Sequence, residues 1–154
     1  SKSKIAALAA ALVAIIVAIA VVIGKADTPA ATDSQINVKD ENAEQREAFI
    51  YQFRWKFAQD SVEVTEVIVP SDFSKGYTEY AEMNKAAGFD LEPYKGLRAK
   101  RWTYDILNYP GYEDKTGYIQ ANLLVYDGTV IGGDICSLEQ GGFLHSFEFP
   151  AQTQ

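Results

Sequence analysis

The feature that most constrains this chain is an unbroken apolar run near its beginning. Residues 5–23 read IAALAAALVAIIVAIAVVI, nineteen apolar residues without a charge, with Lys2 and Lys4 before them and Lys25 after them. At about 1.5 Å per residue, a helix over this run is roughly 29 Å long, close to the hydrocarbon thickness of a bilayer. A core helix of a globular domain would carry a polar stripe, and this run has none. The sequence therefore predicts a membrane-spanning helix.

Two fates of this apolar run stay open. An uncleaved transmembrane signal anchor over residues 1–24 is favoured, because a secretory signal peptide usually has a shorter apolar region of about 7–15 residues. The alternative is a signal peptide cleaved near Gly24-Lys25-Ala26, which would release a secreted domain. The lysines before the run place the N-terminus in the cytoplasm and the rest of the chain outside. We therefore expect a single-pass protein of the cell membrane with an extracytoplasmic C-terminal domain.

The part of the chain beyond the apolar run is acidic. All 21 Asp and Glu residues lie from Asp27 onward, whereas three of the 14 Lys and Arg residues precede it, so the exported part holds 11 basic and 21 acidic residues. A strongly negative domain is not expected to bind nucleic acid. Since Cys136 is the single cysteine, no internal disulfide is possible, and the domain must be stabilised by its core.

The segment after the apolar run divides into a linker, one domain and a tail. Residues 25–41 are rich in small, polar and turn-forming residues and are interpreted as a flexible linker. Residues 42–149 have the periodic patterns of a single extracytoplasmic domain, and residues 150–154 form a tail. Within the domain, Asn42 and Gln45 have the spacing of a capping box, which predicts a helix over 42–53. A second helix is expected between Ser71 and Gly88.

Alternating and apolar runs predict the strands of this domain. The first is SVEVTEVIVP, which ends at Pro70. The dipeptide Asp127-Gly128, between two apolar runs, is a strong signal for a two-residue hairpin. The remaining strands are expected over 97–107, 118–126, 129–138 and 143–149. The predicted fold class is α+β, with an N-terminal transmembrane helix followed by two helices packed on an antiparallel β-meander of four to five strands.

Several segments of the domain resemble one uncharacterised family. The segments LEPYKG, RWTYDILNYP, ANLLVYDGTVIGGDICSLE and GGFLH are similar to domain of unknown function 4830. The resemblance covers about residues 42–148 and implies a small protein of Gram-positive bacteria with a membrane segment and one exported domain. It implies no activity. Members often carry glycine where this chain has Arg54, and arginine tolerates a left-handed helix cap poorly.

The single cysteine and the single histidine lie close together in the sequence. If Gln140 and Gly141 are the central residues of a two-residue turn, Cys136 lies opposite His145, and Asp134 shares their face. These three side chains are the candidate catalytic group of a thiol-dependent enzyme. If the turn is instead a three-residue loop centred on Gly141, Cys136 points away from His145. A structural role in the core is the favoured interpretation, and a zinc site is a poor match because the spacing of metal-binding motifs is missing.

Basic and aromatic residues supply the candidate binding surface. Charges at Arg98, Lys100 and Arg101, beside Lys95, form the only basic cluster of the exported part, although such a cluster often just protects a strand edge. Aromatic side chains bind sugars or protein partners when they are exposed, and the candidates are Trp102, Tyr109 and Tyr112. The pair Gly132-Gly133 indicates a bulge or a close approach of a helix.

These observations favour a non-catalytic binding or interaction module at the cell surface, with a protein or a glycan as its partner and residues 5–23 in the membrane. No motif indicates a cofactor or a metal ion. The alternatives are the thiol-dependent enzyme and a structural subunit of a membrane complex.

Overall fold

The computed structural model describes residues 35–151 of the chain. The predicted membrane-spanning run and the first part of the predicted linker lie outside these residues. Across residues 35–151, none of the helices has the length and apolar character that a membrane span requires.

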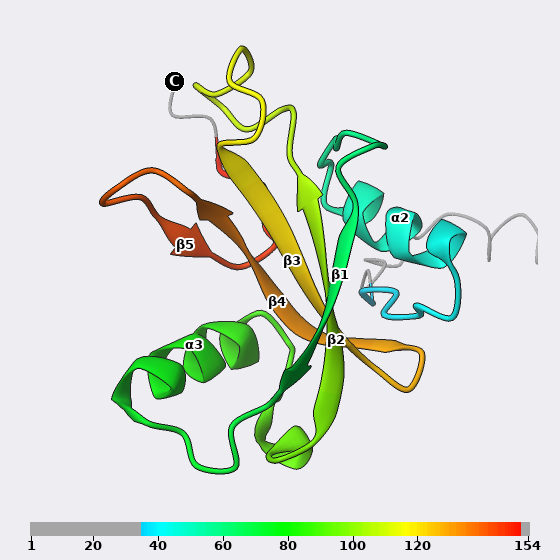
Figure 1. Cartoon of the computed structure of the whole chain (residues 1–154), viewed down its shortest axis with the longest axis vertical. Helices are drawn as coiled ribbons and strands as arrows, with labels where there is room; N and C mark the ends of the chain where they lie inside the picture. Colours follow the sequence, from blue (N-terminus) through cyan, green and yellow to red (C-terminus); the bar gives the residue numbers. More distant parts are fainter. Residues whose placement is uncertain (1–34, 152–154) are drawn as a thin grey trace, which may run out of the picture. The chain divides into compact units, whose positions relative to one another are not determined.

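The described residues form an α+β domain around one five-stranded antiparallel sheet (Figure 1). The strands lie in the order of the sequence, as the meander prediction expects. They are β1 (Glu63–Ile68), β2 (Arg98–Asp105), β3 (Ile119–Tyr126), β4 (Thr129–Ser137) and β5 (Leu144–His145), and the helices are α2 (Ala43–Gln52), α3 (Lys75–Ala86) and the short 3-10 helix η1 (Glu92–Tyr94). The predicted strand over 143–149 is reduced to the two residues of β5.

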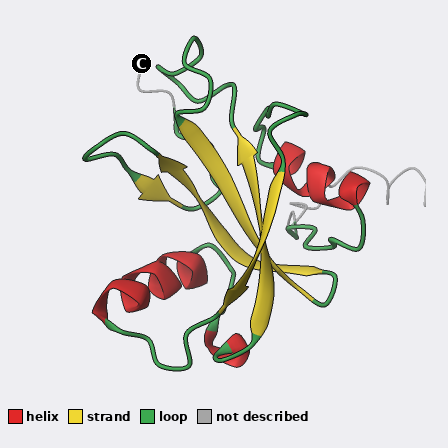
Figure 2. Cartoon of the chain, viewed as in Figure 1, coloured by secondary structure: helices red, strands yellow, loops and turns green. Residues whose placement is uncertain are grey.

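Both predicted helices are present, and they lie on opposite sides of the sheet (Figures 1 and 2). The N-cap prediction for α2 is confirmed, because the Asn42 side chain accepts a hydrogen bond from the backbone N–H of Gln45. The second helix begins at Lys75, later than predicted, with Ser74 as its N-cap. Gly88 follows α3 with φ of +94°, the left-handed conformation expected after a helix.

Arg54 adopts a left-handed backbone conformation just after α2. Arg54 has φ of 69°, so arginine adopts the left-handed conformation that glycine favours. Its guanidinium carbon lies 4.6 Å from the centre of the Phe149 ring, and this contact offsets part of the backbone cost. Helix α2 accordingly ends at Gln52, with Phe53 as the C-cap.

Two apolar clusters hold the helices against the sheet. On one face, Phe49 and Ile50 of α2 pack with Tyr104, Ala121 and Leu123 of the strands. On the other face, Tyr77, Tyr80 and Ala81 of α3 are among the residues that pack around a smaller buried cluster. This cluster comes from the strands and the segments that adjoin β1 and η1, and it includes Ala99, Leu124 and Ile131. We call these the α2 face and the α3 face of the sheet.

The structured domain begins within the predicted linker. Val38 packs against the larger cluster, and its carbonyl accepts a hydrogen bond from the backbone N–H of Val130. Lys39 forms a bridge with Thr129, and the Asp40 side chain is buried. Residues 36–40 therefore belong to the fold rather than to a flexible tether.

A bulge in the β3–β4 hairpin sets which side chains share a face. Asp127 and Gly128 both have positive φ, which confirms the predicted two-residue turn. The register then shifts by one residue between Leu124 and Val125. A hairpin that continued from this turn without the shift would place Cys136 opposite Ile119. With the shift, Cys136 pairs with Gln120, whose side chain lies on the other face of the sheet.

The two glycines beyond the bulge make room for α3. A Cβ atom at Gly132 would lie 2.8 Å from Oδ1 of Asn84 in α3, and a Cβ atom at Gly133 would lie 2.0 Å from the carbonyl oxygen of Asn122 in β3. The backbone N–H of Gly133 donates a 2.8 Å hydrogen bond to the side chain of Asn84 in α3. Both predictions for this glycine pair, a bulge and a close helix, are confirmed.

Candidate functional site

Cys136 and His145 lie on opposite faces of the sheet. In the β4–β5 pair, Cys136 is opposite Leu144, whereas His145 is opposite Ile135. Directly opposed residues point to the same side, so Cys136 and Asp134 share the α3 face and His145 lies on the α2 face. The register that would place Cys136 opposite His145 is therefore not formed. The structure brings together two of the three candidate catalytic residues.

His145 belongs to an aromatic cluster that fixes the loop after β2. The hydroxyl of Tyr109 lies 3.0 Å from Nε2 of His145, and the ring of Tyr109 stacks on Phe143 and on the buried Trp55. The hydroxyl of Tyr112 donates a 2.7 Å hydrogen bond to Glu139. The two predicted binding tyrosines therefore make internal packing contacts, and neither lines the cavities described below.

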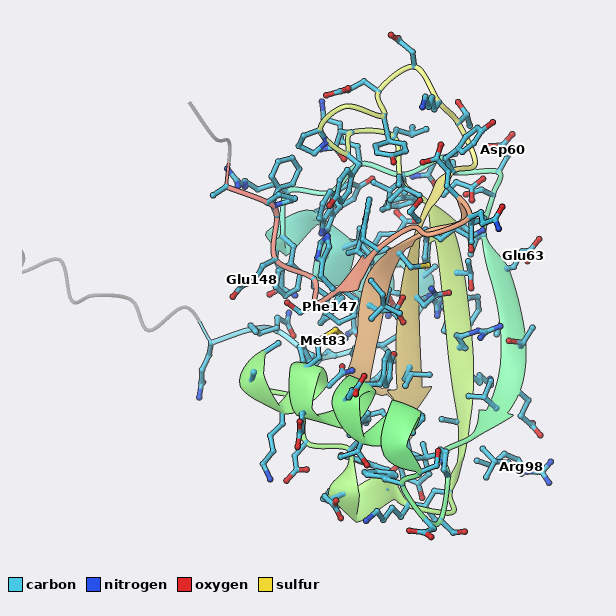
Figure 3. The ribbon with its side chains drawn as sticks, turned by 90° about the vertical axis from the view of Figure 1, so that its left-hand side faces the viewer. Asp60, Glu63, Met83, Arg98, Phe147 and Glu148 are labelled. Carbon is cyan, nitrogen blue, oxygen red and sulfur yellow. The ribbon has the colours of Figure 1, made fainter. Side chains whose placement is uncertain are left out.

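The predicted basic cluster is divided between the two faces. The α2 face of β2 carries Arg98, Lys100 and Trp102 at every second position. These three side chains line a cavity of about 780 Å³. Arg101 points to the α3 face and lines a second cavity, of about 460 Å³. Arg98 also forms an ion pair with Glu66 of β1, and its side chain extends away from the strands at the edge of the sheet (Figure 3). Three of the six predicted binding residues are thus brought together.

The larger cavity, here called the Trp102 cleft, lies between the start of α2, strand β2 and the β3–β4 turn. The buried side chain of Arg46 contributes to its wall. The Arg46 guanidinium carbon lies 3.4 Å from the centre of the Trp102 ring, Nη1 donates a 3.0 Å hydrogen bond to Asp40, and Nε donates a 2.9 Å hydrogen bond to the hydroxyl of Tyr104. The wall is formed by charged groups of both signs, among them Asp40, Glu41, Arg46, Glu66, Arg98, Lys100 and Asp127.

The two oxygens of the buried Asp40 carboxyl group differ in their hydrogen bonding. One oxygen accepts from Arg46, whereas the other, Oδ2, is buried without a hydrogen-bond partner. Burial raises the pKa of Asp40 to about 6, although the positive charges of Arg46 and Lys100 oppose the rise. This ion pair fixes the floor of the Trp102 cleft.

The smaller cavity, here called the Asp134 cavity, lies between α3 and the part of the α3 face that the helix leaves uncovered. A chain of side-chain hydrogen bonds crosses its polar end. The hydroxyl of Tyr80 donates to Asp134 over 2.9 Å, the amide nitrogen of Asn122 donates to Asp134 over 3.0 Å, and Thr103 donates to Asn122 over 2.8 Å. The same Asn122 nitrogen lies 3.5 Å from the sulfur of Cys136.

Burial shifts the titration of the groups in the Asp134 cavity. It raises the pKa of Asp134, while the hydrogen bonds from Asn122 and Tyr80 oppose the rise. Burial, and then the negative charge of Asp134, raise the pKa of Cys136 to about 11. A nucleophilic thiol needs a lowered pKa, so this environment makes Cys136 a poor nucleophile near neutral pH.

Sequence reasoning missed Arg46, Asp40, Tyr80 and Asn122. Arg46 precedes Phe49 and Ile50 at helical spacing, so a charge on the apolar side of a helix was the available signal. Asn122 alternates with the apolar positions of β3 and so marks a polar face. Asp40 carried no comparable signal. In the described part of the chain, no three His, Cys, Asp or Glu side chains gather as a metal site would require.

Comparison with known proteins places the chain in a family. The family model described as Domain of unknown function (DUF4830) matches residues 49–135. These residues include β2, β3 and α3, and with them Trp102, Asn122 and Asp134, whereas Cys136 and His145 lie beyond the match. No curated protein and no solved structure matches the chain. Because the match covers more than half of the sequence, the chain belongs to the family of domain of unknown function DUF4830.

Proposed function

We propose that this protein is a non-catalytic binding module, tethered to the membrane and exposed outside the cytoplasm, and that the Trp102 cleft is its ligand site. The observation that carries the binding part of this proposal is the position of Trp102 and Arg46 in the wall of a cavity of about 780 Å³. Cavities of about 300–1,000 Å³ are typical of ligand sites. The tether rests on the apolar run over residues 5–23.

The chemistry of the Trp102 cleft favours a neutral oligosaccharide as the ligand. A sugar hydroxyl both donates and accepts hydrogen bonds, so it suits a wall with cationic donors such as Lys100 and carboxylate acceptors such as Glu41 and Asp127. The apolar face of a sugar ring packs on an aromatic ring, and Trp102 supplies one. The positive charge of Arg46 is already paired with Asp40, so it does not require an anionic ligand.

The Asp134 cavity does not support the alternative of a thiol-dependent enzyme. That mechanism needs a base beside the thiol, and His145 is on the other face of the sheet. The raised pKa of Cys136 also keeps the thiol protonated near neutral pH.

Calorimetric titration of the full chain, in a non-ionic detergent, tests the binding part. We expect neutral oligosaccharides to bind, and Trp102→Ala and Lys100→Gln to weaken binding at least tenfold, which corresponds to about 1.4 kcal/mol. Tyr118→Ala is the matched control, because Tyr118 is 45% exposed and lies outside both cavities. Absence of saccharide binding, or undiminished binding by Trp102→Ala, would overturn the proposal.

Protease accessibility tests the tether. On cells whose outer layers have been removed and whose cytoplasmic membrane is intact, added protease should cleave a C-terminal epitope from the full chain. Without protease, the full chain should sediment with the membranes. Replacing Ile15 and Ile16 with Asp in the apolar run should release the chain from the membrane fraction, because a charge at the centre of a span is costly. An epitope that becomes accessible only after lysis would contradict this topology.

A further inference from the structure

Among the residues that the structure describes, Asp134 is a buried carboxylate without a cationic partner. Its side chain lies on the α3 face, and the residue is 6% exposed. Its hydrogen bonds come from two neutral groups, the hydroxyl of Tyr80 and the amide of Asn122. None of the ion pairs formed within residues 35–151 includes Asp134. A buried charge is normally neutralised by a partner, so a position for a cation is left open here.

The nearest positive charge does not fill that position. Arg101 also lines the cavity, but its side chain is exposed, and its effect on the pKa of Asp134 is the weakest of those that act on it. In the sheet register Arg101 lies beside Leu124, whereas Asp134 lies beside Asn122, which is two residues before Leu124 in β3. Arg101 therefore stands toward the mouth of the cavity.

Apolar and aromatic side chains form the rest of the wall. Val67 of β1, Leu124 of β3 and Leu144 of β5 supply the aliphatic part. Tyr77 and Tyr80 of α3 supply two rings, with centroids 5.5 Å apart and planes inclined by 48°. Aromatic rings attract a cation that lies over their faces. The cavity volume, about 460 Å³, is sufficient for a small organic group.

We propose that the Asp134 cavity binds an organic ammonium group carried on a short apolar stem. The ammonium lies against the carboxylate of Asp134 and beside the tyrosine rings of α3, and the stem lies along Val67, Leu124 and Leu144. Two sources carry this chemistry, a free alkylamine and the side chain of a lysine in a polypeptide. The site is separate from the Trp102 cleft and does not depend on its ligand.

Cys136 is a reporter built into this cavity. It is the single cysteine of the chain, it lines the cavity, and it is only partly buried. The first experiment compares the rates at which cationic, neutral and anionic methanethiosulfonates modify Cys136 in the full chain in a non-ionic detergent. After normalisation to a free thiol, we expect the cationic reagent to react at least about tenfold faster than the anionic one, because the carboxylate attracts it.

Two variants with opposite expected effects make this test specific. Asp134→Asn keeps the shape and both hydrogen bonds, since Asn accepts from Asn122 and donates to the hydroxyl of Tyr80, and it should abolish the preference for the cationic reagent. Arg101→Gln should increase that preference. A wild-type ratio equal to that of a free thiol, or a ratio unchanged by Asp134→Asn, would overturn the proposal.

A second experiment uses the wild-type protein alone and measures how well added amines protect Cys136 from modification. n-Butylamine should slow the modification of Cys136 by the neutral reagent, whereas n-butanol, with the same stem and no charge, should not. Protection by Nα-acetyl-lysine amide as well as n-butylamine would assign the site to a lysine side chain, and protection by n-butylamine alone would assign it to a free amine. Equal effects of n-butylamine and n-butanol, or none from either, would rule out ammonium recognition.

Discussion

The two sides of the sheet each hold a buried aspartate, and within residues 35–151 only one of them has a cationic partner. On the α2 side, Asp40 accepts a hydrogen bond from Arg46 at 3.0 Å, and the guanidinium is itself held by Tyr104 and Trp102. On the α3 side, Asp134 accepts hydrogen bonds from the neutral side chains of Tyr80 and Asn122, and none of the ion pairs within residues 35–151 includes it. The comparison separates an ion pair that completes the fold from a carboxylate whose charge remains available to a ligand.

The comparison would fail most clearly if Arg46 were dispensable. Arg46→Met leaves the carboxylate of Asp40 buried without its cation, so we expect a loss of about 3–5 kcal/mol in the free energy of unfolding, measured by urea denaturation at pH 7. Arg101→Met, on the α3 side, should change it by less than about 0.5 kcal/mol because Arg101 is exposed. Similar losses for the two variants would contradict the distinction.

The next largest effect concerns the bulge that assigns residues to the two faces. Gly133→Ala should destabilise the domain by about 3 kcal/mol or more, because the new Cβ meets the Asn122 carbonyl at 2.0 Å and the Phe147 ring at 2.4 Å. Gly141→Ala is the control. Its φ is also positive, +72°, but the new Cβ has open space, so only about 1 kcal/mol of backbone strain is expected. Equal melting temperatures for the two variants would show that this close packing is not required.

The reactivity of Cys136 sharpens the comparison on the α3 side. With its pKa raised from 9.0 to about 11, the thiol should be alkylated by iodoacetamide at pH 8 far more slowly than an ordinary cysteine. The fall in thiolate fraction alone is about 100-fold. The rate should also rise through pH 9 without a plateau. His145→Ala should leave the rate unchanged, since His145 faces the other side, and a slower rate in this variant would contradict the β4–β5 register.

The smallest effect is on how the free energy of unfolding varies with pH. Because the pKa of Asp40 is raised in the folded state, from 3.8 to about 6, the folded protein binds this proton more tightly than the unfolded chain. This group therefore stabilises the fold at low pH, and its contribution is lost as the pH rises from about 4 to about 6. The difference between wild type and Asp40→Asn in urea denaturation at pH 4, 5, 6 and 7 isolates this contribution. A difference that does not vary with pH would refute it.

Much of the secondary structure could be predicted because its signals are local. Asn42 and Gln45 cap α2, Asp127 and Gly128 form the turn, and Gly88 follows α3, each through contacts or backbone angles within a few residues. The α+β class and the antiparallel meander follow from the same patterns. The side of the sheet that each helix covers could not be predicted, because both helices are joined to the strands by chain long enough to reach either face.

The site could be predicted only in part, because its geometry depends on one residue of register. Every second position of β2 is occupied by Arg98, Lys100 and Trp102. Their common face therefore follows from the sequence once the strand is known. Cys136 and Asp134 lie beyond the bulge, and a one-residue shift moves them to the other face. The carboxylate–guanidinium pair of Asp40 and Arg46 joins a segment interpreted as a linker to a helix, and no periodic pattern reports such a contact.

Strand β1 forms one edge of the sheet, and this edge affects whether the protein associates with itself in concentrated solution. Val64 and Ile68 are 49% and 63% exposed, so two copies could extend their sheets into each other through apolar edges. Glu63 and Glu66 lie on the same strand. Glu66 is paired with Arg98, whereas none of the ion pairs within residues 35–151 includes Glu63, and like charges brought together at this edge repel. Colloidal stability therefore depends on those carboxylates staying ionised: acid and high salt both weaken the repulsion that keeps the edges apart.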